Sequence, residues 1–396
     1  MKHSALLSLF LFFFSATSWS QAWPHDANKT WNDEIEHQYS KWIENNVDDN
    51  FLRRPGRVYS GMSVDCADFV YLLRMVFAMD NGLEFAINDP SRPGQIISSR
   101  SRRWQMHPQK VRAFFQYVFD VTNTQTLPND TVLVPLSKTG LRPGVILLGD
   151  KKRGHSMVIK NFKPSGIPIL FYGNLPAREF VYTAYNFPDP LSYFPLGPIS
   201  QARGGGFRWF KWPQDLSRSL SEISYAGEDQ LVAGKDLVHY FDLVQKVVRV
   251  RTVVRDELVN YMIDDLCSQV RVRINTITDA AQFLKRNSYR ESHWRMSAAE
   301  DDRFSTYKRD ESIRGLISKI QVEYKQALQN TSYPLSTATK ARLHSVFMPK
   351  GTMNDECIID WAENRIEPLG WIIERYQSGL ISSRAQDPLG VRWGMP

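Results

Sequence analysis

The feature that most restricts the fold is a change in sequence pattern near residue 217. Between residues 131 and 172 the chain consists of short apolar runs separated by turn-forming proline and glycine. Such runs predict strands. Beyond residue 217 the pattern is helical almost to the C-terminus, with basic and acidic side chains alternating as on solvated helix faces. The sequence therefore predicts an α+β domain, residues 23–215, followed by an all-helical domain, residues 216–396.

The expected elements follow from hydrophobic periodicity. The predicted strands are 132–134, 145–148, 156–159, 167–172 and 207–212. The predicted helices are 31–46, one that begins near Cys66, 107–121, 236–254, 257–283, 313–328, 337–346 and 355–376. The strand 207–212 is both aromatic and basic, so Trp209 is a candidate for glycan contact. The alternative is a last strand with aromatic side chains on both faces.

The first 22 residues predict export. Lys2 and His3 precede an apolar run, residues 5–14, and small residues flank possible cleavage points after Ser20 and Ala22. This is the pattern of a secretory signal peptide, and the run is too short to span a bilayer. No later segment is long and apolar enough for a membrane span. The predicted location is the periplasm or the extracellular space.

The net charge and the motifs of the chain restrict the kinds of partner that it is expected to bind. The net charge is +7, which favours contact with anionic cell-wall polymers or membrane surfaces. An exported chain without a nucleic-acid-binding motif is not expected to bind nucleic acid. The sequence shows no metal-ligand spacing, and no cofactor is implied.

Three cysteines in an oxidising compartment leave one unpaired. Cys267 and Cys357 both lie in helix-like segments of the second domain, and Cys66 lies far upstream. We therefore predict a Cys267–Cys357 disulfide and a free thiol at Cys66. The alternative is two separate buried thiols.

Cys66 occupies the start of a predicted helix. Ser63 or Asp65 is a suitable N-cap, and apolar residues recur at helical spacing from Phe69 onward. A thiol in the first helical turn lies near unpaired N–H groups and the positive end of the helix dipole, which favour the nucleophilic thiolate. The other interpretation is a small buried side chain at the top of a core helix.

A thiol nucleophile needs a base, and His155 has the best setting. It follows a polar loop, residues 149–154, and starts the predicted strand 156–159. A histidine held at the mouth of a strand can be oriented toward a helix N-terminus, where it forms an ion pair with the thiolate and later protonates the leaving amine. A structural or exposed histidine is the alternative.

Two motifs resemble those of the NlpC/P60-type cysteine peptidases. Residues 65–70, Asp-Cys-Ala-Asp-Phe-Val, are similar to the nucleophile helix of that family, and residues 143–149 with Gly154 and His155 are similar to its strand pair. The resemblance covers roughly residues 50–212. It implies a papain-like fold and cleavage of peptidoglycan stem peptides by a Cys–His pair. Ala67 stands where serine is usual and Val145 where aspartate is usual, and residues 88–121 lengthen the Cys–His separation.

The resemblance also implies a third polar residue on the strand after the histidine. Asn174 can accept a hydrogen bond from the imidazole and fix its tautomer, and Tyr172 on the same strand face is the alternative. Residues 59–61, Tyr-Ser-Gly, loosely resemble the Tyr-x-x-Gly-Gly sequence that precedes the cysteine in that family. The residues expected to contact substrate are Tyr59, Asp65, Tyr172 and Trp209.

These inferences converge on an exported thiol hydrolase acting on peptide or isopeptide bonds of peptidoglycan. In this hypothesis Cys66 attacks, His155 is general base and then acid, and Asn174 orients it. Backbone N–H groups at the start of the cysteine helix supply much of the oxyanion hole. The rival hypothesis is a non-catalytic envelope protein, in which the papain-like half is a binding scaffold and the helical half docks a partner.

Overall fold

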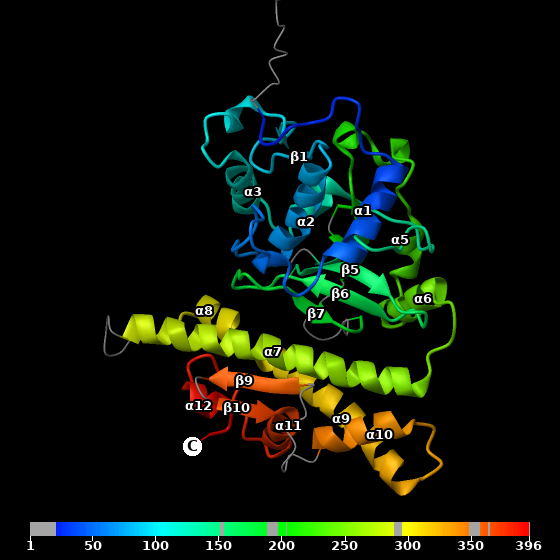
Figure 1. Ribbon diagram of the computed structural model, residues 1–396, viewed down its shortest axis with the longest axis vertical. Coiled ribbons are helices and arrows are strands. Elements are labelled where there is room, and N and C mark those ends of the chain that lie inside the picture. The colour runs from blue at the N-terminus through cyan, green and yellow to red at the C-terminus, as the bar shows by residue number, and fades with distance from the viewer. Residues whose placement is uncertain are drawn as a thin grey trace, which may run out of the picture.

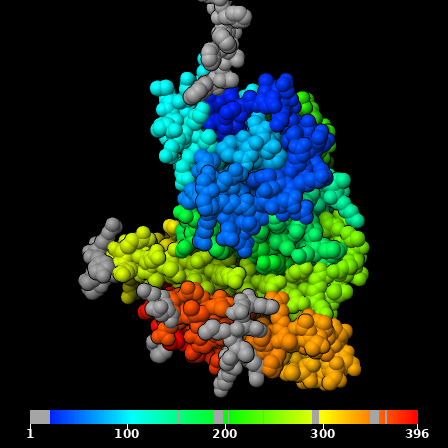
Figure 2. Space-filling model, in the orientation of Figure 1, coloured from blue at the N-terminus to red at the C-terminus, as the bar shows by residue number. Residues whose placement is uncertain are grey.

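In the computed structural model (Figure 1) the described residues are 21–150, 154–187, 197–202, 204–288, 295–347, 357–362 and 365–395. Nearly all of the predicted signal peptide lies outside these residues. The long helix α7 (Arg255–Ser288) crosses the middle of the molecule. The N-terminal half lies on one side of α7 together with the short helix that follows α7, and the other C-terminal elements lie on the opposite side (Figures 1 and 2).

The N-terminal half contains helices and a central sheet. Its helices are α1 (Asp33–Asn46), α2 (Cys66–Asp80), α3 (Lys110–Val121) and α4 (Leu127–Asp130). Its strands are β1 (Ala86–Asn88), β2 (Ile96–Ser98), β3 (Thr131–Leu133), β4 (Ile146–Asp150), β5 (Ser156–Phe162), β6 (Pro168–Tyr172), β7 (Tyr182–Ala184) and β8 (Gly204–Phe210). β1 and β2 form a separate hairpin. The other six strands form one antiparallel sheet in the order β3-β8-β4-β5-β6-β7.

The sheet is covered on both faces. On one face, Val158 and Phe171 pack with the apolar side chains of α1, α2 and α3. On the other face, Met157 and Tyr172 pack in a second core. Because both faces are buried, the strands read as continuous apolar runs and not as a strict alternation. An antiparallel six-stranded sheet with helices packed on it agrees with the predicted α+β class.

A buried ion pair joins α1 and α2 to the sheet. Arg74 donates to Glu36, and both side chains are almost fully buried. The Arg74 guanidinium also lies 3.3 Å from the centre of the Trp31 ring, and Trp212 donates its indole N–H to Glu36 at 2.9 Å. The carboxylate therefore accepts from two donors, which is what a buried charge requires.

The segment that follows the sheet packs on its second face. Helices α5 (Asp229–Ala233) and α6 (Leu237–Val248) lie here. Tyr225, Tyr240 and Val244 join the second core together with Val272 of α7. The predicted domain boundary at residue 216 therefore falls within a continuous apolar core, and the helices that pack away from the sheet begin with α7.

The C-terminal part is mainly helical, with α8 (Ala298–Phe304), α9 (Tyr307–Gln329), α10 (Thr337–Phe347), α11 (Leu369–Gln377) and α12 (Leu389–Arg392). The helix predicted over residues 355–376 is wrong in its first part. Residues there form an antiparallel hairpin, β9 (Ile358–Ala362) with β10 (Arg365–Pro368). Pro368 then caps α11. β9 buries Ile359 and Trp361 and exposes Asp360, an alternation typical of a half-buried strand. Among the described residues no helix has the length and apolar character to cross a membrane.

The predicted disulfide is confirmed. Cys267 of α7 is bonded to Cys357, just before β9, with a Cα–Cα distance of 6.0 Å. Cys66 is free. The bond links the central helix to the hairpin through the third apolar core, which includes Ile263, Leu266 and Ile359.

We expect the disulfide to contribute much of the stability of the C-terminal part. The bridged residues are 90 apart in sequence, and the chain-entropy estimate for such a loop is about 4–5 kcal/mol, an upper limit. A Cys267→Ala/Cys357→Ala variant should have a clearly lower melting temperature, measured by circular dichroism. Cys66→Ala is the control, because it removes one buried sulfur without removing a cross-link, and it should lower the melting temperature much less. Three titratable thiols in denatured, unreduced protein would contradict the assignment.

Candidate active site and interdomain pocket

The start of α2 is fixed by a capping box. The Asp65 side chain accepts from the N–H groups of Ala67 and Asp68 at 2.8 and 2.9 Å, and the Asp68 side chain accepts from Asp65 N–H at 3.0 Å. These contacts satisfy the donors that begin a helix. Of the two predicted N-caps, Asp65 is the one used. The Asp65 carboxylate therefore caps the helix, and this role explains its position without any contact with a substrate.

The Cys66 side chain is only 5% exposed. Its carbonyl accepts a hydrogen bond from Ser156 Oγ at 2.7 Å, which ties the start of α2 to β5. Burial raises the pKa of the Cys66 thiol to about 12, and the charge of Asp65 acts in the same direction. Hydrogen bonds from Ser156 and Ala67 lower the pKa less than burial raises it. The shift is opposite to the one expected for a reactive thiol at a helix N-terminus, because the site excludes the water that stabilises a thiolate.

His155 lies on the other face of the sheet from Cys66. Neighbouring residues of a strand point to opposite faces, and the adjacent Ser156 points toward α2. The His155 ring packs edge-to-face on Tyr172, with ring centres 5.1 Å apart. Tyr172 in turn belongs to the second core, on the face away from α2. Burial, and to a smaller extent the positive charge of Arg309, lowers the pKa of His155 to about 3. The imidazole is therefore neutral at physiological pH.

The structure thus brings Cys66 together with Ser156, and His155 together with Tyr172. An acyl-transfer dyad needs the sulfur and a ring nitrogen within hydrogen-bond reach on one side of the sheet. The raised pKa of the Cys66 thiol and the lowered pKa of the His155 imidazole favour the two neutral forms over the expected ion pair. The register of β5 presents Ser156 to the carbonyl of Cys66.

The two candidates for the third catalytic residue, Asn174 and Tyr172, have different surroundings. Asn174 accepts a hydrogen bond from the N–H of Leu175 at 3.0 Å, the behaviour of a turn residue. Tyr172 is the one that contacts the imidazole, and burial raises the pKa of Tyr172 to about 12. The Tyr172 ring also stacks on Tyr182 at 5.5 Å. Its environment is that of a core aromatic side chain.

The remaining weak candidates lie in the core. Tyr59 is 1% exposed and stacks on Phe51 with ring centres 4.5 Å apart. Trp209 is 9% exposed, and Arg142 lies over its ring at 4.0 Å. Because both rings are covered, neither offers a face to a glycan in this structure. The interpretation of the strand 207–212 as a last strand, with aromatic side chains on both faces, fits β8.

The segment after β6 covers the start of α2. Val64 and Arg178 form an antiparallel bridge, with hydrogen bonds in both directions at 3.0 and 3.2 Å. Gly173 approaches the backbone so closely that a Cβ there would lie 2.1 Å from the carbonyl oxygen of Asp65. Residue 173 therefore packs directly against the backbone that precedes Cys66.

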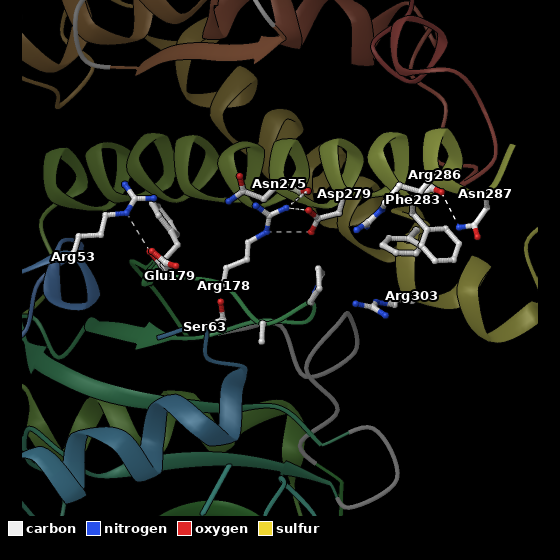
Figure 3. Close-up of a pocket in the computed structure, with 14 residues that line it drawn as sticks. Arg53, Ser63, Arg178, Glu179, Asn275, Asp279, Phe283, Arg286, Asn287 and Arg303 are labelled. Atoms are coloured by element: carbon white, nitrogen blue, oxygen red, sulfur yellow. Dashed lines mark hydrogen bonds and ion pairs between the residues drawn. The ribbon is translucent and has the colours of Figure 1, made fainter. Parts of the chain in front are cut away.

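A pocket of about 710 Å³ lies next to this cover, between the N-terminal half and α7 (Figure 3). Its walls come from residues 176–180, from the exposed turns of α7, and from α8. The lining residues are Arg53, Ser63, Pro176, Ala177, Arg178, Glu179, Phe180, Asn275, Asp279, Phe283, Arg286, Asn287, Arg303 and Phe304.

The arginines that line the pocket differ in the ion pairs and hydrogen bonds that they form. Arg178 is ion-paired with Asp279 and donates to the carbonyl of Asn275 at 3.1 Å, so it holds the two halves together. Arg286 and Arg303 are exposed, and among the described residues neither has a carboxylate within ion-pair distance. Figure 3 places both at the same end of the pocket as Phe283. This end offers two cations beside an aromatic surface.

Sequence reasoning missed the residues that define this geometry. The sequence marks Ser156 only as part of a strand, and its hydrogen bond to the carbonyl of Cys66 is visible only in the structure. Arg286 and Arg303 belong to a helical half whose charges were interpreted as solvated faces. Only the fold brings these arginines to the segment 176–180, more than 100 residues earlier in the chain.

The chain matches no family model, no curated protein and no solved structure. Within the described ranges no group of three or more His, Cys, Asp or Glu side chains is arranged to hold a metal ion. The assignment of a function therefore depends on the geometry above.

We expect Gly173 to be intolerant of any side chain. Gly173→Ala should lower the free energy of unfolding by about 1–3 kcal/mol, because the new methyl group meets rigid backbone at Asp65. Gly315→Ala is the matched control. It lies in α9 with nothing within 4 Å of the added Cβ, and alanine there should stabilise by about 0.5–1 kcal/mol. Chemical denaturation measures both, and equal stability of Gly173→Ala and wild type would contradict the packing described.

The depressed pKa of His155 makes a second prediction. Because the folded value is about 3 and the ordinary value is 6.5, the unfolded chain binds more protons between these pH values. Stability should therefore fall as the pH falls below 6.5. The exposed area of His155 is intermediate although protein surrounds its ring, so we expect about 0.5–1 kcal/mol per pH unit relative to His155→Gln. Denaturation curves of both proteins between pH 4 and 7 test this, and parallel pH profiles would contradict it.

Proposed function

We propose that this chain is a non-catalytic binding protein of the cell envelope, in which a papain-like N-terminal half is a scaffold and the pocket against α7 holds the ligand. One observation carries the proposal. Cys66 is buried at the start of α2, where Ser156 donates to its carbonyl, the His155 ring packs on Tyr172, and neither Cys66 nor His155 lines the pocket.

The pocket supplies the binding surface. Arginine guanidinium groups recognise carboxylates through paired N–H donors. Three lining arginines have no ion pair among the residues described; Arg53 donates to the carbonyl of Glu179 at 3.2 Å, whereas Arg286 and Arg303 lie together at the other end. Phe283 and Phe304 add apolar area beside them. A ligand with a carboxylate and an apolar portion fits this combination. Peptides of acidic character are the ligand class that we propose.

Peptidoglycan stem peptides are the first ligands to test. They carry carboxylates, they are the substrates implied by the resemblance to NlpC/P60-type peptidases, and the N-terminal pattern of the chain predicts export to their compartment. The proposal keeps this ligand class and replaces cleavage by binding. The thiol hydrolase remains the alternative, and it would require a rearrangement that exposes Cys66 and turns His155 toward it.

The proposal is tested with soluble stem peptides released from peptidoglycan. Titration calorimetry should detect binding to the wild type and at least tenfold weaker binding to Arg286→Glu/Arg303→Glu, because two attractive charges become repulsive. The matched control is Arg102→Glu/Lys138→Glu. It makes the same change in net charge at exposed residues outside the pocket and should bind like the wild type.

Mass spectrometry of the same mixtures separates binding from catalysis. The peptides should be recovered intact from the wild type and from Cys66→Ala alike. Cleavage that disappears in Cys66→Ala would establish the hydrolase instead. Failure of the wild type to bind, or equal binding by both double variants, would contradict the assignment of the pocket.

A further inference from the structure

The connection between α6 and α7 exposes apolar side chains among cations. Residues 249–254 form this α6–α7 loop, at the right edge of Figure 1. Val250 is 80% exposed, Val254 is 52% exposed and Val253 is 38% exposed. Leu258, on the first turns of α7, is 37% exposed. Exposed apolar residues that follow one another in this way mark a contact surface more often than isolated ones do.

The loop is held in place by the protein behind it. The N–H groups of Val250 and Arg251 both donate to the carbonyl of Pro164, at 2.7 and 3.0 Å. Pro164 belongs to the turn between β5 and β6. Arg251 is ion-paired with Glu257 at 2.8 Å, and Arg255 is ion-paired with Glu323 at 2.9 Å. The valines are therefore presented outward by a braced backbone.

The charge next to the valines is mainly positive. From residue 243 to residue 255 the chain carries Lys246, Arg249, Arg251 and Arg255, and the nearest acids along the chain are Asp242 and Asp256 at either end. The carboxylates that pair with Arg251 and Arg255 lie behind them, with side chains only 10% and 11% exposed. The outward side of the loop is cationic as well as apolar.

We propose that the α6–α7 loop docks the protein on the surface of a bilayer that contains anionic lipid. The valines enter the boundary between headgroups and acyl chains, and the flanking cations meet the phosphates. Charge complementarity favours this occupant over a second copy of the chain, because a symmetric contact would bring the same cations face to face. The inference does not depend on the ligand of the pocket.

Vesicle flotation tests the proposal with purified protein. The wild type should float with vesicles of phosphatidylcholine and phosphatidylglycerol in equal parts, more weakly at high salt, and should not float with phosphatidylcholine alone. Val250→Asp should lower the bound fraction about tenfold or more, because an acid replaces the apolar group at the point of insertion. Met106→Asp is the control. Met106 is 89% exposed in the N-terminal half, and its replacement should leave binding unchanged.

Three results would overturn the proposal. The first is equal flotation of Val250→Asp and Met106→Asp. The second is equal binding of the wild type to both kinds of vesicle. The third is a dimer that Val250→Asp dissociates, without flotation of the wild type. Circular dichroism of each variant confirms that folding is unchanged.

Discussion

The hydrogen bond from Ser156 Oγ to the carbonyl of Cys66 fixes how the central sheet meets its main helix. It sets the face of β5 that looks toward α2. Because side chains alternate along a strand, it also sets the face on which His155 must lie. The burial of Cys66 and the packing of His155 on Tyr172 both follow from this register. A shift of β5 by one residue would exchange the two side chains.

The α7 helix has a comparable role between the two halves. Val272 packs in the core of the sheet, whereas Val259, Ile263 and Ile277 pack in the C-terminal core. Asn275 donates to the hydroxyl of Tyr182 at 2.9 Å. A helix that belongs to two cores positions the surfaces on either side of it, and this explains why the pocket has one wall from residues 176–180 and the other from α7. The disulfide at Cys267 anchors the same helix to the β9 hairpin.

Much of the fold could be predicted where the pattern was local. The cap at Asp65, the helix that starts at Cys66 and the strands β3 to β6 all have clear signals in the sequence, and cysteine counting gave the disulfide. The face of His155 could not be predicted. With apolar layers on both sides of the sheet, the run Ser156 to Ile159 carries no alternation that would distinguish the two registers. The hairpin at residues 358–368 was hidden for a related reason, because a short apolar segment fits either a helix or a strand.

The central claim is that Cys66 is a buried structural thiol, and its alkylation rate tests that claim most directly. Cys66 is the one cysteine of the chain outside the disulfide, so iodoacetamide at neutral pH reports on this thiol alone. With a pKa of about 12, the folded protein should react roughly a thousandfold more slowly than the same protein unfolded in guanidinium chloride. His155→Ala should leave the rate of the folded protein unchanged. Alkylation of the folded protein as fast as that of the unfolded chain, and slowed by His155→Ala, would contradict the account and restore the catalytic dyad.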